Sequence, residues 1–147
     1  MNHHEHPALI ALSQQIAVKH SLNPALVCAV IEQESGWNPW AMRFEPAFER
    51  RYIHPALPLA PSTEELSLAI SWGLMQVMGE TAREHGFTSR FLNALCDPGI
   101  GVSVGCTVLS GKLDKAKGGI RKGLLSWNGG ANNDYAEQVL ARISNYE

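Results

Sequence analysis

Apolar side chains recur at three- and four-residue intervals along most of the chain, a pattern typical of amphipathic helices. Residues 8–20 carry one such stripe. Asn23 and Pro24 then read as an N-cap followed by proline at the first helical position, and this helix is expected to end near Ser35, before Gly36. The pattern therefore predicts an all-α protein, with further helices at about residues 63–71, 79–85, 88–95, 99–114, 119–126 and 132–145.

Residues 37–71 interrupt the helical pattern. Prolines recur through this stretch and exclude long helices, because proline lacks a backbone N–H and clashes with the preceding turn. Its aromatic residues, and the lack of a Gly/Ser composition, indicate a packed insertion rather than a flexible tether. The 147 residues are expected to form a single domain, residues 1–147, in which residues 1–7 are a flexible terminus.

Net charge and residue composition exclude several classes of binding partner. A net charge of -2 offers no basic surface to a nucleic acid, and no run reaches the roughly 18 apolar residues that membrane insertion needs. The three cysteines lack paired spacing and are expected to be free thiols. Neither the terminal cluster of His3, His4 and His6 nor the later histidines predict a metal site. We expect a monomer without metal or cofactor.

Glu34 occupies an unusual position on its helix. Seven residues separate it from Val27, so at about 100° per residue both point the same way, at the end of the apolar stripe. Glu32 points about 160° away, toward the polar face. Partial burial and the negative helix C-terminus both raise the pKa of a carboxyl group, which suits a proton donor. The alternative is a solvated glutamate at a fraying helix end.

Short segments appear in a characteristic order: Glu34-Ser35, then residues 73–78 (GLMQVM), residues 126–130 (SWNGG) and Tyr135. Together they resemble the lytic transglycosylase and goose-type lysozyme superfamily over about residues 8–146. The resemblance implies a lysozyme-like helical domain whose cleft binds the glycan strands of peptidoglycan.

Individual residues match the motifs of that superfamily. Glu34 matches its catalytic glutamate, and Tyr135 matches a late tyrosine, for whose hydroxyl Glu34 is one candidate partner. Trp127 stands where the superfamily usually has tyrosine, so a hydroxyl hydrogen bond is expected to be lost there and no catalytic role is assigned. Trp37 and Trp40 are candidates for stacking on sugars or for core anchoring. The substrate-binding residues implied by the resemblance are Ser35, Gly73, Leu74, Met75, Gln76, Asn128 and Tyr135.

The resemblance implies cleavage of the β-1,4 bond between N-acetylmuramic acid and N-acetylglucosamine. A lytic transglycosylase would leave 1,6-anhydro ends. A hydrolytic muramidase would need a second carboxylate, for which Glu45 is the best candidate and Glu49 the next; Glu45 can equally pair with Arg43 or Arg50. A non-catalytic glycan-binding or virion module, and a helical interaction protein with chance motif matches, are the alternatives from other classes.

The insertion also resembles a subgroup found in phage and prophage proteins, through its segments at residues 43–46 (RFEP) and 48–52 (FERRY). The N-terminus lacks the basic and apolar regions of a secretory signal peptide. We therefore expect a phage-encoded lysis protein that is made in the cytoplasm and acts in the periplasm or cell wall.

Overall fold

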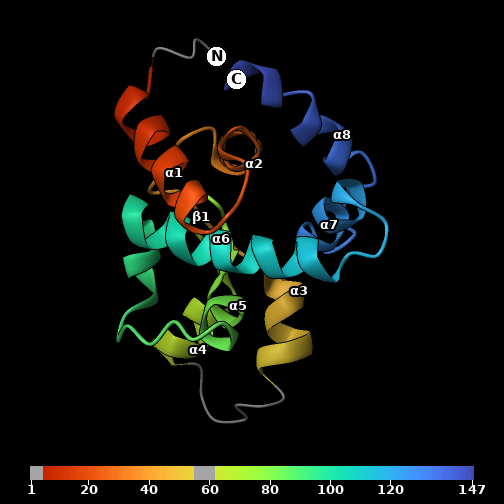
Figure 1. Ribbon diagram of the computed structural model, residues 1–147. Helices are drawn as coiled ribbons and strands as arrows, with labels where there is room; N and C mark the ends of the chain where they lie inside the picture. Colours follow the sequence, from red (N-terminus) through yellow and green to blue (C-terminus); the bar gives the residue numbers. More distant parts are fainter. Residues whose placement is uncertain (1–4, 55–61) are drawn as a thin grey trace.

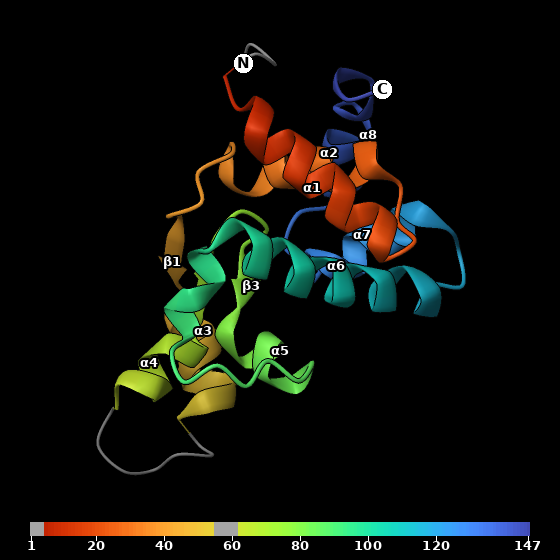
Figure 2. The same cartoon turned by 60° about the vertical axis from the view of Figure 1, so that its left-hand side comes forward.

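The computed structural model describes residues 5–54 and 62–147, and it is mainly helical. Helix α6 (Pro98–Lys115) runs through the middle of the molecule, between two groups of elements (Figures 1 and 2). One group holds α1 (Pro7–Lys19), α2 (Pro24–Ser35) and α8 (Tyr135–Leu140). On the other side lie α3 (Pro46–Phe48), α4 (Thr63–Leu68), α5 (Gly79–Glu84) and a small sheet. Helix α7 (Ile120–Trp127) follows α6.

The predicted helix starts are confirmed at two central helices. The Asn23 side chain accepts hydrogen bonds from the backbone N–H groups of Ala25 and Leu26, at 2.8 and 3.2 Å. Asp97 caps α6 in the same way, accepting from the N–H of Ile100 at 2.9 Å. In both helices proline follows the cap, where its missing N–H costs no hydrogen bond.

A three-stranded antiparallel sheet is the main feature that the sequence pattern missed. Its order is β1 (Met42–Phe44), β2 (Ile70–Trp72) and β3 (Val77–Met78), with Arg43 opposite Ser71 and Trp72 opposite Val77. Strands of two or three residues are too short for their alternation to be recognised. The insertion is thus part of the fold, because it supplies the edge strand β1.

Several other predicted helices are shorter than expected. The segment at 88–95 forms a 3-10 helix at Leu92–Cys96, and the last helix divides into α8 and a 3-10 turn at Ile143–Asn145. Helix α4 ends at Leu68 because the chain enters β2. A π-helical turn at Glu49–Ile53 follows α3. Of the expected flexible terminus, residues 1–4 lie outside the described residues, and α1 begins at Pro7.

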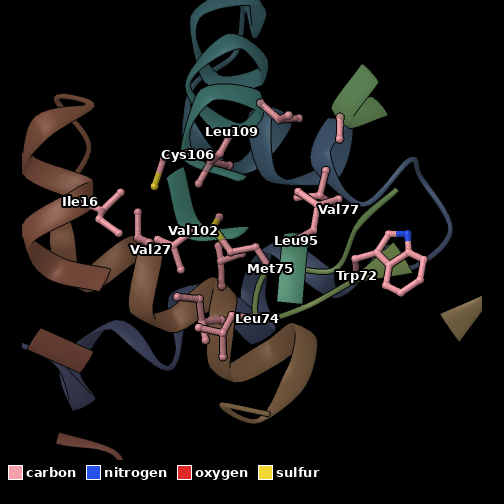
Figure 3. Close-up of a cluster of buried hydrophobic side chains, with 14 of the residues drawn as sticks. Ile16, Val27, Trp72, Leu74, Met75, Val77, Leu95, Val102, Cys106 and Leu109 are labelled. Carbon is pink, nitrogen blue, oxygen red and sulfur yellow. The ribbon is translucent and has the colours of Figure 1, made fainter. Parts of the chain in front are cut away.

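The core packs α1, α2 and α6 against the loop before β3 (Figure 3). Met75 has no exposed surface and lies against Gly105, where an added Cβ would come within 2.4 Å of the Met75 sulfur. Gly101, one turn earlier, packs as closely against the backbone of Leu95. Small residues on this face of α6 therefore allow the loop to lie directly on the helix.

The expectation of free cysteines is confirmed. Cys28, Cys96 and Cys106 are buried and unbridged. Burial raises the pKa of Cys28 and of Cys106 to about 12, so both remain neutral thiols that pack as small apolar side chains. Within the described ranges, no helix combines the length and apolar character that crossing a bilayer requires.

Two glycines of α6 offer a matched test of this packing. At Gly101 a Cβ would lie 2.2 Å from the Leu95 carbonyl oxygen, whereas at Gly111 it would meet nothing within 4 Å. Gly101→Ala should lower the free energy of unfolding by roughly 1–3 kcal/mol through overpacking. Gly111→Ala should raise it by up to about 1 kcal/mol, because alanine favours the helix. Chemical denaturation measures both; equal effects at the two sites would contradict the close approach.

Candidate active site

Glu34 lies in the last turn of α2 and faces a cleft of about 800 Å³. Residues of α2, α3, α5, α6, α7, α8 and all three strands contribute to its lining. Its lining residues are Gln33, Glu34, Arg43, Glu45, Phe48, Ser71, Gln76, Val77, Met78, Thr81, Val108, Lys112, Ser126, Trp127, Asn128, Gly129, Ala131, Asn132 and Tyr135.

Two donors from other helices hold the Glu34 carboxyl group. The indole N–H of Trp127, at the end of α7, donates to Glu34 Oε1 at 2.9 Å. The hydroxyl of Tyr135, at the start of α8, donates to the same oxygen at 2.5 Å. Among the described residues, no donor lies within hydrogen-bond distance of Oε2. The acidic proton is therefore expected on Oε2, the oxygen available to a substrate.

Burial raises the pKa of Glu34 above the usual value for glutamate, because desolvation penalises the carboxylate. The hydrogen bonds from Tyr135 and Trp127 and the positive charge of Arg43 act in the opposite direction, but burial outweighs them. The pKa of Tyr135 is also raised, by its own burial and by Glu34. Tyr135 thus stays protonated and remains a donor to the carboxyl group.

The contact between Tyr135 and Glu34, expected as one candidate, is present. Trp127 offers no hydroxyl hydrogen bond, as the sequence indicates, but its indole N–H supplies a hydrogen bond to Glu34 that the sequence did not predict. An indole N–H is a donor only, so it can serve a carboxyl oxygen as a hydroxyl does. The donor capacity of tryptophan was the sequence signal that could have identified this residue.

The candidate second carboxylate, Glu45, also lines the cleft, but it is paired. Arg43, on β1, contacts Glu45 with 2.7 Å between Arg43 Nε and Glu45 Oε1. This is the alternative that the sequence left open for Glu45. Arg43 and Glu45 both line the cleft together with Glu34.

Gln76 and Asn128 line the cleft and also hold its loops together. The Gln76 amide nitrogen donates to the carbonyl oxygens of Ala41 and Gly73, at 3.0 and 2.9 Å. In the amide orientation that satisfies its neighbours, the Asn128 oxygen accepts from the backbone N–H groups of Asn132 and Ala131, at 2.8 and 3.2 Å. These side chains fix the rim from which any contact to a substrate would be made.

Four of the predicted substrate-binding residues do not line the cleft. Leu74 and Met75 are 1% and 0% exposed and belong to the core, so the interpretation of Met75 as a cleft wall is wrong. Gly73 is buried at a φ of 71° against Leu95, where it shapes the turn. The Ser35 hydroxyl donates back to the Ile31 carbonyl of its own helix, at 3.2 Å. These residues therefore contribute to the packing and the backbone conformation near the site, and they do not line the cleft.

The two tryptophans near the end of α2 also differ from one another. Trp37 is 3% exposed and donates its indole N–H to the Tyr146 hydroxyl at 2.8 Å, which makes it a core anchor. Trp40 is 76% exposed but does not line the cleft. Several lining residues from other elements were not predicted as site residues from the sequence, including Phe48, Met78, Thr81, Val108, Lys112 and Asn132.

One group of residues outside the cleft could hold a metal ion. Single ligand atoms of Glu49, His54 and Glu65 all lie within 4.8 Å of one another, although no ligand spacing was recognised in the sequence. Glu65 is buried, and its Oε1 lies 3.2 Å from Nδ1 of the exposed His54. This contact with His54 gives the buried Glu65 carboxyl group a hydrogen-bond partner without an ion.

The comparisons agree with the geometry of the site. The family described as the transglycosylase SLT domain matches residues 11–143, which include every element that lines the cleft. No solved structure matches the chain. Members of this family are lytic transglycosylases that act on peptidoglycan. With its acid, its cleft and nearly its whole length matched, the chain belongs to the transglycosylase SLT domain family and has the lysozyme-like fold and peptidoglycan-cleaving activity of that family.

Proposed function

We propose that the chain cleaves the β-1,4 bond between N-acetylmuramic acid and N-acetylglucosamine, with Glu34 as the only catalytic carboxyl group, and forms 1,6-anhydro-muramic ends. The observation that carries this function is the Glu34 carboxyl, which is desolvated, faces the cleft and is held through one oxygen by Trp127 and Tyr135. One oxygen is thereby fixed, and the other is left to exchange a proton with the substrate.

In the first step, neutral Glu34 donates its proton to the glycosidic oxygen while the bond from that oxygen to C1 of the muramic residue breaks. The sugar develops oxocarbenium character, and Glu34 becomes a carboxylate. Trp127 and Tyr135 bond most strongly to the charged form, so they stabilise the enzyme as this charge develops. The substrate N-acetyl group can support the positive charge at C1.

In the second step, the Glu34 carboxylate removes a proton from the C6 hydroxyl of the same muramic residue. The C6 oxygen forms a bond to C1 and closes the 1,6-anhydro ring. Glu34 is protonated again, and no water is consumed. One carboxyl group therefore acts first as acid and then as base, which departs from the usual two-carboxylate arrangement of glycosidases.

A hydrolytic muramidase is the second candidate, because Glu45 lines the same cleft. In that reaction Glu45 would position a water molecule for attack on C1. Its ion pair with Arg43 favours the transglycosylase, since that contact engages a Glu45 oxygen that would otherwise be free to hold the water molecule. A non-catalytic glycan-binding module is disfavoured, because binding alone does not need a buried acid beside the glycan.

We further propose that the protein acts as a monomer on the cell wall, in the periplasm of a bacterium that is lysed by the phage or prophage encoding it. The support is the resemblance of the segment around Arg43, Glu45 and Phe48 to the phage subgroup. Arg43, Glu45 and Phe48 all line the cleft, so the segment that carries this resemblance is also part of the active site.

Glu34→Gln should keep the fold and lower the rate of glycan cleavage by at least about 100-fold, because an amide cannot donate an acidic proton. Clearance of a peptidoglycan suspension measures the rate. Glu32→Gln, on the same helix two residues earlier, is the matched control and should stay within tenfold of the parent. Cleavage by Glu34→Gln within tenfold of the parent would remove Glu34 from its role.

The products and Glu45→Gln together separate the two reactions. Digestion should release muropeptides lighter by one water molecule than hydrolysed ones, as determined by mass spectrometry. Glu45→Gln should reduce the rate less than about tenfold, because Glu45 is not required for C6 attack. Hydrolysed products, with a loss above about 100-fold in this variant, would assign the muramidase reaction instead.

Trp127→Phe should move the basic limb of the kcat/KM profile to higher pH. Trp127 stabilises the Glu34 carboxylate and lowers its pKa, so removing it raises that pKa. Glu34 then stays protonated to higher pH, while the rate itself falls because the carboxylate is less well stabilised. Trp40→Phe, outside the cleft, is the control and should leave the limb in place. A shift toward lower pH would contradict the assigned contact.

A further inference from the structure

Lys112 is a cation of the cleft that the mechanism does not use. It lies on α6 one turn after Val108, and both residues line the cleft. The side chain is only half-buried, so its ammonium group can reach a ligand in the cleft. Within residues 5–54 and 62–147, no carboxylate lies within 4.0 Å of that ammonium group.

In the part of the chain that the structure describes, the charged side chains that line the cleft leave one positive charge without a partner when Glu34 is protonated. Arg43 and Glu45 neutralise each other through their ion pair. Glu34 is uncharged when it acts as the acid. One positive charge, on Lys112, is left facing a substrate whose sugar backbone is neutral. An unpaired cation that is partly removed from water gains free energy from an anionic group on the substrate.

Lys112 is also separate from the acid. The cation that lowers the pKa of Glu34 is Arg43, on β1. Lys112 projects from α6, and neither the hydrogen bonds to Glu34 nor the positive charge that lowers its pKa come from that helix. Its charge is therefore directed at a part of the substrate other than the bond being cleaved.

We propose that Lys112 binds a carboxylate of the stem peptide that peptidoglycan carries on its muramic residues, and that it gives the enzyme a preference for peptide-bearing strands. This inference rests on the proposed function. Within a peptide-bearing strand, every muramic lactyl group is consumed in an amide bond, so the available carboxylates belong to the peptides. Lys112 is thus a specificity residue for the peptide rather than for the sugars.

The test compares two forms of one substrate. Uncross-linked peptide-bearing strands are acetylated on their amino groups and divided, and one half is converted to methylamides by carbodiimide coupling with methylamine. The two halves then differ only in their carboxylates. The parent should show a KM about fivefold lower for the carboxylate form, the size expected of a partly exposed ion pair, with similar kcat.

Lys112→Gln should reduce this discrimination to nearly one by raising KM for the carboxylate form. Lys112→Arg keeps the positive charge and should retain most of the discrimination between the two forms. Lys115→Gln is the matched control, because Lys115 is an exposed lysine at the end of the same helix and outside the cleft lining; it should discriminate as the parent does. Equal KM for both forms in the parent, or equal losses on both forms in Lys112→Gln, would overturn the assignment.

Binding separates failure of this inference from failure of the proposed function. In the Glu34→Gln background, which does not require turnover, affinity for the carboxylate strands should fall about fivefold on adding Lys112→Gln. A parent that binds with this discrimination but cleaves neither form would overturn the proposed function alone. A parent that cleaves both forms, with no effect of Lys112→Gln on binding, would overturn the role of Lys112 alone.

Discussion

The proposed activity depends on one carboxyl group, that of Glu34, which is largely buried and accepts two hydrogen bonds. Glu34 loses much of its hydration at the end of α2, and burial by itself would favour its neutral form. Trp127 and Tyr135 supply two hydrogen bonds to one oxygen, from the end of α7 and the start of α8. A carboxyl group whose neutral form is favoured by burial, and whose charged form is stabilised by fixed donors, is suited both to give and to take a proton. Three helices must meet at this point for either property to exist.

The rest of the fold brings the other charged side chains into the cleft that contains Glu34. Helix α6 separates the two groups of elements (Figure 2), and its glycines let the loop before β3 pack directly on it. That loop continues into the sheet, whose edge strand β1 contributes Arg43 to the lining of the cleft. The insertion therefore completes the cleft that begins at Glu34. Arg43 and Glu45 form an ion pair in this cleft. The positive charge of Lys112 therefore remains available to a negatively charged part of the substrate.

The sequence predicted the features that follow from local periodicity and motif. The boundaries of α1 and α2, the side of the helix on which Glu34 lies, and the match of Tyr135 were all accessible, because each depends on a few neighbouring residues. The sheet was not, since strands of two or three residues have no recognisable period.

The motif also did not distinguish residues that line the cleft from residues that support it. Met75 and Ser35 carry the family pattern, but Met75 packs against Gly105 and Ser35 bonds to its own helix. The contact from Trp127 was not predicted, because the superfamily pattern has a tyrosine hydroxyl at that position and the indole N–H is a different kind of donor. Arg43 and Lys112 depend on contacts between distant segments, which no local pattern contains.

The most direct measurement is the ionisation of Glu34 itself. Carboxyl carbons of glutamate can be followed by NMR as the pH is changed in protein labelled at that carbon, and the Glu34 signal is identified by its loss in Glu34→Gln. The account predicts a signal that titrates above the usual glutamate range, because burial outweighs the donors and Arg43. A Glu34 signal that titrates at or below that range would show a solvated or over-stabilised carboxylate, and the acid on which the catalytic account depends would be lost.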